Sequence, residues 1–232
     1  TVPLIVNRKE FLPAYVSDKT LVIVSSNSGN TAETISAYQQ ASEKKAQIMI
    51  ITSGGKLKEE AKANNLALLE IPSGYPPRQA FGFAFFTLLF QFSAWNWFTL
   101  EKKEISDVKT TVKTLLKRNQ PTKSNKNSMS FNIARTIYKK IPIFYTATPW
   151  LDPVLTRWRN QIHENSKSLA FSNVIPEMNH NEIVGWEMDY PVNDNLVVVL
   201  LQDMNVTGDR KRRLNLTREI IAKKCQNIVD VY

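Results

Sequence analysis

Residues 21–34 read LVIVSSNSGNTAET, an apolar run that leads into a turn rich in hydroxyl groups. The run Leu21–Val24 has the length and composition of a buried strand, and apolar side chains recur at helical spacing after Thr31. The turn therefore joins a strand to the first turn of a helix. Short buried strands that alternate with helices are typical of a parallel sheet covered by helices on both faces.

This turn has the chemistry of an anion site. The first N–H groups of a helix lack intrahelical partners, and the helix dipole adds partial positive charge there. An ordinary helix cap needs one hydroxyl, whereas residues 25–31 carry four. A glycine lets the backbone approach a ligand closely. The sequence therefore predicts a phosphate-binding turn formed by Ser26, Ser28, Gly29, Asn30 and Thr31.

The alternation of strands and helices continues along the chain. Strands are predicted at Pro3–Val6, Leu21–Val24, Ile48–Ile51, Ala67–Ile71, Ile141–Tyr145, Leu169–Val174, Leu196–Leu201 and Ile228–Tyr232. Helices are predicted at Thr31–Lys44, Leu57–Ala63, Arg78–Phe98, Phe131–Lys140, Pro153–Lys167 and Arg210–Lys224. We expect an α/β fold of two doubly wound halves, residues 1–118 and 129–232, joined by a polar linker at 119–128. Because the chain opens almost on a strand and closes on one, we also expect truncation at both ends.

The composition narrows the class of protein. The formal net charge of +9 favours an anionic partner, which leaves nucleic acid, a membrane surface and a phosphorylated metabolite open. Cys225 is the only cysteine, so the chain has no disulfide framework, which favours a reducing compartment such as the cytoplasm. The basic run Arg210–Arg213 is interpreted as a solvated helix start rather than a nucleic-acid contact.

The apolar segment Ala80–Leu100 is about long enough to span a bilayer. Its polar residues Gln91, Ser93 and Asn96 are costly in lipid but tolerable in a protein core with partners. We interpret the segment as a buried helix covered on several sides, in part by a second subunit, and expect no membrane span.

Three further residues are candidates for chemistry. Arg78 follows a strand and precedes a helix, where open α/β sheets bind ligands. Glu164 lies near the end of the helix that begins at Pro153, and His180 lies in a polar loop after the next strand. On chemistry alone each has a plain alternative: a surface arginine, a solvated helix-end carboxylate and a surface histidine.

At this point the residues resemble a known family. The sequence Ser26-x-Ser28-Gly29-Asn30-Thr31-x-Glu33-Thr34 is similar to the phosphosugar motif of the SIS (sugar isomerase) domain. Three later motifs resemble the bifunctional phosphoglucose/phosphomannose isomerase branch: Pro77-Arg78, Gln161-x-x-Glu164-Asn165-x-Lys167 and Glu177-x-x-His180-Asn181. The resemblance covers nearly the whole chain, and the order of the four motifs makes it specific.

The resemblance implies two SIS subdomains in a homodimer whose active site lies at the subunit interface. It implies an aldose–ketose isomerase that converts glucose 6-phosphate or mannose 6-phosphate to fructose 6-phosphate through an enediol, with no metal or cofactor. Glu164 is implied as the base, Arg78 as the cation that stabilises the enediolate, and His180 as the group that assists ring opening, from its own subunit or the partner's. Which C2 epimer is preferred stays open.

Two departures from the family are visible. Members carry a Gly-Gly-Ser turn before the position of Thr1 and a lysine-bearing helical segment after that of Tyr232. Two alternatives also remain. A non-catalytic SIS module that senses sugar phosphates needs the phosphate turn but not Glu164 and His180, and another SIS isomerase would share the turn but not the later spacing.

Overall fold

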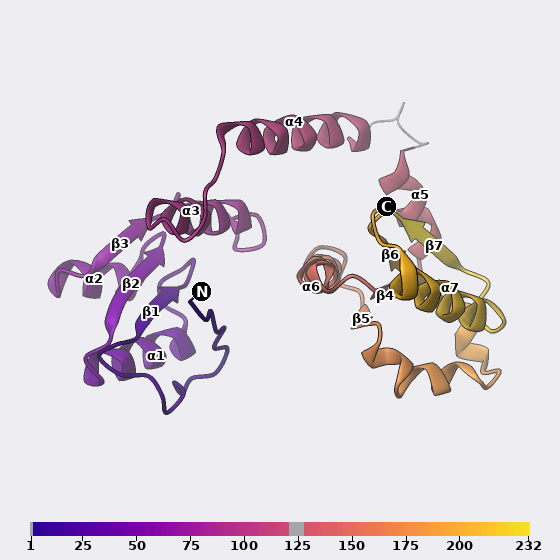
Figure 1. Cartoon of the computed structure of the whole chain (residues 1–232), viewed down its shortest axis with the longest axis horizontal. Coiled ribbons are helices and arrows are strands. Elements are labelled where there is room, and N and C mark those ends of the chain that lie inside the picture. The colour runs from indigo at the N-terminus through magenta and orange to yellow at the C-terminus, as the bar shows by residue number, and fades with distance from the viewer. Residues whose placement is uncertain (1, 121–127) are drawn as a thin grey trace. The chain divides into compact units, whose positions relative to one another are not determined.

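The computed structural model describes residues 2–120 and 128–232. The chain separates into two compact units, Thr1–Asp107 and Val108–Tyr232. Each unit is built around its own parallel sheet (Figure 1).

The first unit contains a three-stranded sheet in the order β1 (Leu21–Ser25), β2 (Gln47–Thr52) and β3 (Ala67–Glu70). Val24 pairs with Ile50, and Ile50 pairs with Leu68, in a parallel register. Helices α1 (Ala32–Glu43) and α2 (Gly55–Ala63) cover one face and bury Tyr38, Leu57 and Ala61 against the strands. Because side chains alternate along a strand, Met49 and Ile51 of β2 lie on the other face.

Helix α3 (Phe81–Ala94) covers that second face (Figure 1). Its residues Phe83, Ala84 and Leu88 pack against the sheet. Helix α4 (Lys102–Asn119) follows and runs across the division between the units. Helix α4 was not predicted from the sequence, although its apolar residues recur at helical spacing: Ile105, Val108, Val112, Leu115 and Leu116.

The second unit contains a four-stranded parallel sheet in the order β5-β4-β6-β7. Its strands are β4 (Ile141–Thr146), β5 (Phe171–Val174), β6 (Leu196–Leu201) and β7 (Ile228–Val231). Helices α5 (Met129–Ile137) and α6 (Asp152–Gln161) cover one face, and α7 (Gly208–Ala222) covers the other. Alternation along β6 explains both layers, since Val197 and Val199 face α5 and α6 whereas Val198 and Leu200 face α7.

Short helical turns complete the second unit. A π-helical turn, η2 (Ile162–Ser166), continues α6, and four 3₁₀ turns lie in the connections: η1 (Pro149–Leu151), η3 (Glu177–Asn179), η4 (Glu182–Trp186) and η5 (Pro191–Asn195). Met178 of η3 and Trp186 of η4 are buried against α7. The loop after β5 is therefore held to the core at two points.

The predicted α/β class with parallel sheets flanked by helices is confirmed, two details differ, and one prediction stays untested. Pro3–Val6 is not a strand; these residues are exposed and pair with no strand of the described chain. The apolar segment at 80–100 forms the shorter α3, none of whose residues is buried within this chain. The predicted linker at 119–128 falls largely on residues 121–127, outside the described residues, and the 1–118 and 129–232 boundaries stay predictions.

Candidate functional site

The hydroxyl-rich turn lies between β1 and α1, as predicted. Ser26 Oγ and Thr31 Oγ1 are 2.9 Å apart, and Gly29 N donates to Ser26 Oγ at 3.2 Å. Ser26 is buried, whereas Ser28 and Thr31 are exposed. The turn therefore gathers hydroxyl groups over the start of α1 in one rigid loop.

Thr31 is the N-cap residue of α1, but its side chain makes no cap hydrogen bond to the helix. The hydroxyl bonds to Ser26 instead. An ordinary cap would satisfy one of the first-turn N–H groups, which have no intrahelical acceptor. Here the first turn of α1 keeps its donors and its positive dipole end for a ligand, which is what an anion requires.

Arg78 lies in the turn Pro76–Ala80 that follows β3 and precedes α3. Arg78 is half-buried. The residue belongs to this turn and not to the helix, which begins three residues later than predicted, at Phe81. The turn forms because Gln79 N and Ala80 N both donate to Pro76 O, at 2.8 and 3.2 Å. Arg78 thus lies in the same unit as the hydroxyl-rich turn, on a connection at the carboxyl end of the sheet, where open α/β sheets bind ligands.

Glu164 lies in the π-helical turn at the end of α6, and its side chain is exposed. Turns of this kind widen a helix locally and are frequent at functional sites. The wide turn is held in two ways: Ala170 N donates to His163 Nε2 at 3.1 Å, and Lys167 Nζ donates to Glu164 O at 2.7 Å. Lys167 ends the turn in the left-handed conformation, with φ of 55°. The carboxylate is therefore presented to solvent from a fixed backbone.

His180 lies directly after η3, in the loop that leaves β5. Glu182 anchors this loop to the sheet: Tyr145 Oη donates to one carboxylate oxygen, and Asn173 Nδ2 donates to the other at 2.6 Å. Burial of Tyr145, and then its hydrogen bond to Glu182, raise the pKa of the Tyr145 hydroxyl above its ordinary range. Glu182 was not predicted as an anchor from the sequence, because its contact with Tyr145 joins residues 37 positions apart.

Glu164 and His180 lie on different segments of the second unit, the π turn after α6 and the loop after η3. Glu164 precedes β5 and His180 follows it, so the two residues connect to opposite ends of this strand. A four-residue strand is about 13 Å long. No hydrogen bond or ion pair within the part of the chain that the structure describes joins the two side chains.

A pocket of about 280 Å³ lies beside His180. Pro176, Asn179 and His180 line it from the loop, and Arg213 lines it from α7. Asn179 Nδ2 donates to Thr217 Oγ1 at 2.7 Å, while Asn179 Oδ1 is buried without a hydrogen-bond partner among the described residues. Arg213 was not predicted as a neighbour of His180, since the run Arg210–Arg213 was interpreted only as a helix start.

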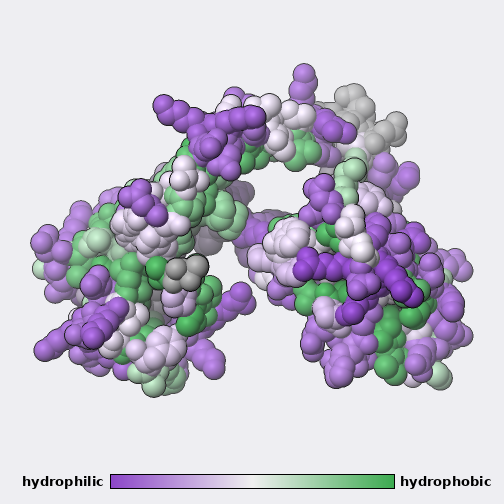
Figure 2. Space-filling view, viewed as in Figure 1, coloured by the Kyte–Doolittle hydropathy of each residue, from purple (hydrophilic) through white to green (hydrophobic). Residues whose placement is uncertain are grey.

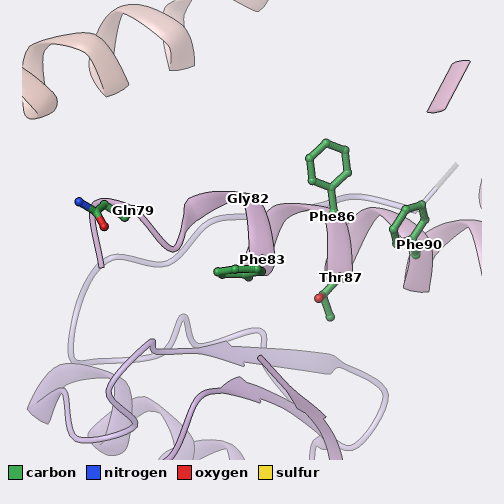
Figure 3. A pocket seen from close by; sticks show the side chains of 6 residues that line it. All are labelled: Gln79, Gly82, Phe83, Phe86, Thr87 and Phe90. Atoms are coloured by element: carbon green, nitrogen blue, oxygen red, sulfur yellow. The ribbon is translucent and has the colours of Figure 1, made fainter. Parts of the chain in front are cut away.

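A larger hollow of about 390 Å³ lies on α3 (Figure 3). Its lining is mainly apolar and aromatic: Gln79, Gly82, Phe83, Phe86, Thr87 and Phe90. Phe83 points toward the sheet, and Phe86 points away from it (Figure 3). No residue of the hydroxyl-rich turn lines this hollow, so it has the chemistry of a packing surface and not of a phosphate site.

Two further findings concern the described residues, 2–120 and 128–232. They contain no group of three or more His, Cys, Asp or Glu side chains arranged to hold a metal ion. They also contain no helix with the length and hydropathy needed to cross a membrane.

Comparison with known proteins identifies the family. Residues 126–232 match the bacterial phospho-glucose isomerase C-terminal SIS domain, and residues 8–88 match the SIS domain. The chain is 40% identical to the bifunctional phosphoglucose/phosphomannose isomerase of Caldicellulosiruptor bescii, covering 100% of this chain and 68% of that protein. It is 35% identical to the protein of the same description from Aquifex aeolicus, covering 94% of this chain and 64% of that protein.

The fold agrees with solved structures as well. The glucosamine-6-phosphate deaminase of Thermotoga maritima superposes with a TM-score of 0.67 at 14% identity, covering 95% of this chain and 63% of that one. The chain thus spans about two thirds of the length of the curated relatives it matches. Its two sheets, its phosphosugar turn and its similarity along the whole sequence show that the chain belongs to the SIS-domain family of bifunctional phosphoglucose/phosphomannose isomerases.

Proposed function

We propose that the protein is an aldose–ketose isomerase that interconverts glucose 6-phosphate or mannose 6-phosphate with fructose 6-phosphate. The single observation that carries the proposal is the turn between β1 and α1, whose N-cap hydroxyl binds Ser26 and leaves the helix donors open. Family membership supports the chemistry, because the relatives named above are described as isomerases of these two sugars.

The phosphate group would be bound by the turn at residues 26–31. Ser26, Ser28 and Thr31 would donate hydroxyl hydrogen bonds, and first-turn N–H groups of α1 would donate the rest. Charge-assisted hydrogen bonds of this kind are roughly twice as strong as neutral ones. The phosphate then holds the sugar in one orientation, which is the precondition for proton transfer at a chosen carbon.

Glu164 would be the base. In the open-chain aldose its carboxylate takes the proton from C2 while the C1 oxygen gains a proton, which gives an enediol with a C1–C2 double bond. The same group then returns a proton to C1 while the C2 hydroxyl loses its proton and becomes the ketone. Arg78 would stabilise the negative charge that develops on the sugar oxygens. His180 would assist transfer of the C1 hydroxyl proton to the ring oxygen as the bond between C1 and the ring oxygen breaks. The exposed carboxylate on a fixed π turn supports the role of Glu164, since a base must reach a substrate without rearranging.

The test is a coupled assay for formation of fructose 6-phosphate from each aldose in the presence of EDTA. General acid–base catalysis contributes about 10²–10⁴ in rate. We expect Glu164→Gln to lower kcat by about that factor while KM changes little. Glu219→Gln, the same change at an exposed carboxylate of α7 outside the proposed site, is the matched control. Retention of wild-type kcat in Glu164→Gln would refute the assignment.

The competing function is a non-catalytic SIS module that senses sugar phosphates. It predicts saturable binding of fructose 6-phosphate with no turnover of either aldose. It also gives no reason for the order of the later motifs around Glu164 and His180. The assay above separates the two functions directly.

We also propose a homodimer. Six large apolar side chains of the α3 region are exposed (Figure 2): Phe81, Phe85, Phe86, Phe90, Trp97 and Phe98. Exposed apolar surfaces of this kind are typical of protein–protein interfaces. A second copy of this chain is the proposed occupant, because the resemblance of the site motifs to the isomerase family implies a homodimer. Light scattering tests this, with Phe86→Glu and Phe90→Glu expected to give the monomer. Wild-type protein that is monomeric at micromolar concentration would refute it.

Glu164 precedes β5 and His180 follows it. This separation supports an active site in which Glu164 comes from one subunit and His180 from its partner. Mixing the inactive variants Glu164→Gln and His180→Ala then restores activity, because one of the two sites in a mixed dimer is wild-type. If both residues act within one subunit, each mixed site carries a lesion and the mixture stays inactive.

A further inference from the structure

The phosphate turn is bonded to a second turn, at residues 53–57, which joins β2 to α2. Ser53 N and Ser53 Oγ both donate to Asn27 O, at 3.1 and 2.6 Å. Leu57 N donates to Gly29 O at 3.1 Å, and Lys56 N donates to Asn30 Oδ1 at 2.9 Å. Every one of these bonds runs from a donor of the second turn to an oxygen of the first.

The direction of these bonds has an electrostatic consequence. Lys56 N and Leu57 N are early donors of α2, which have no intrahelical acceptor. They donate to Asn30 Oδ1 and Gly29 O rather than to a ligand, and Ser53 binds Asn27 O in the same way. Oxygens that faced a phosphate group would repel it, so binding them to α2 removes them from the ligand side. The donors of α1 remain for the anion.

The two glycines of the second turn differ sharply in their surroundings. Gly55 has φ of +68°, and a Cβ built on it would lie 2.3 Å from Ser28 O and 2.7 Å from Asn30 Oδ1. A Cβ on Gly54 would meet no atom within 4 Å, and its φ of 166° is extended backbone that any residue adopts. Of these two glycines, only Gly55 must lack a side chain for the two turns to come into contact.

We propose that the turn at 53–57 fixes the shape of the phosphate turn, with Gly55 and Asn30 as positioning residues. The inference rests on the proposed function, because it assigns a role toward the same phosphate group. Asn30 acts here through Lys56 N and not through the ligand. This differs from the prediction from sequence, in which Asn30 binds the phosphate itself.

The test measures binding of inorganic phosphate and of fructose 6-phosphate by calorimetry, beside KM and kcat. We expect Gly55→Ala and Asn30→Ala each to weaken binding of both ligands and to raise KM by about tenfold, with kcat at saturation changed less than twofold. Gly54→Ala is the matched control and should bind as the wild type does. The double variant should lose little more than either single variant, because both changes break one contact between the turns.

Two outcomes in the single variants would overturn the inference. One is phosphate binding of wild-type strength in a folded Gly55→Ala protein; if that variant does not fold, Asn30→Ala decides in its place. The other is equal weakening by Gly54→Ala. If the losses of phosphate affinity in the two single variants add in the double variant, Asn30 binds the phosphate directly instead of acting through Lys56 N. Wild-type protein that binds phosphate without turnover would refute the isomerase while leaving this inference intact, and absence of phosphate binding would refute the inference itself.

Discussion

Gly29 is the tightest point of the phosphate turn, and replacing it with alanine is the sharpest test of the contact between the turns. Its φ is +69°, and a Cβ there would lie 1.8 Å from Gly54 O and 2.8 Å from Gly54 C. The left-handed conformation costs a residue other than glycine roughly 1–2 kcal/mol. Forcing the two backbones apart adds about 1–3 kcal/mol, by analogy with overpacked cores.

We therefore expect Gly29→Ala to lower the free energy of unfolding of the first unit by about 2–5 kcal/mol. A domain is stable by only ~5–15 kcal/mol, so the loss is large. Urea unfolding, followed by hydrogen exchange at the amides of buried Ile50 and Ile51, assigns the change to this unit.

Gly82→Ala is the control, since a Cβ on Gly82 in helix α3 would meet no atom within 4 Å. Alanine is the better helix former by roughly 0.5–1 kcal/mol, so this variant should be as stable as the wild type or slightly more so. If the free energy of unfolding of Gly29→Ala lies within about 0.5 kcal/mol of the wild-type value, the two turns are not in contact as described.

Two further predictions concern hydrogen bonds outside the phosphate turn. Tyr145→Phe removes the hydrogen-bond donor to Glu182 and should lower the free energy of unfolding by about 1–3 kcal/mol, measured by urea titration. Because Glu182 anchors the loop that carries His180, the variant should also have a lower kcat. Because the pKa of Tyr145 is raised in the folded state, wild-type stability should fall as pH rises above about 10, and this fall should be less steep in the variant. A variant with the same alkaline slope would contradict the assignment. The hydrogen bond from Lys58 lowers the pKa of Glu70, so the stabilisation from this pair is present near neutral pH and lost as pH falls through the lowered pKa. Thermal melts of Glu70→Gln should match the wild type at acidic pH and lie slightly below it at neutral pH, since the pair is exposed; a difference that grew on acidification would contradict this reading.

Much of the fold was predictable because its information is local. The strands β4 and β6 were predicted within one residue, since runs such as Leu196–Leu201 are apolar without interruption, as a strand covered on both faces must be. Pro3–Val6 has the same apolar character but forms no strand, because a strand also needs a neighbour to pair with. Helix α4 was missed because its apolar residues are spread among lysines and threonines, and most of it is exposed.

The sequence by itself determined the parallel α/β class, the hydroxyl turn before α1 and the family, because each depends on residues close together in the chain. Only the tertiary structure decided what these residues meet. It placed the turn at 53–57 against the phosphate turn and used Asn30 to bond Lys56. It also left the aromatic face of α3 open. The physical reason is that these contacts join segments more than twenty residues apart or depend on strand order, and neither quantity is expressed in the local pattern of side chains.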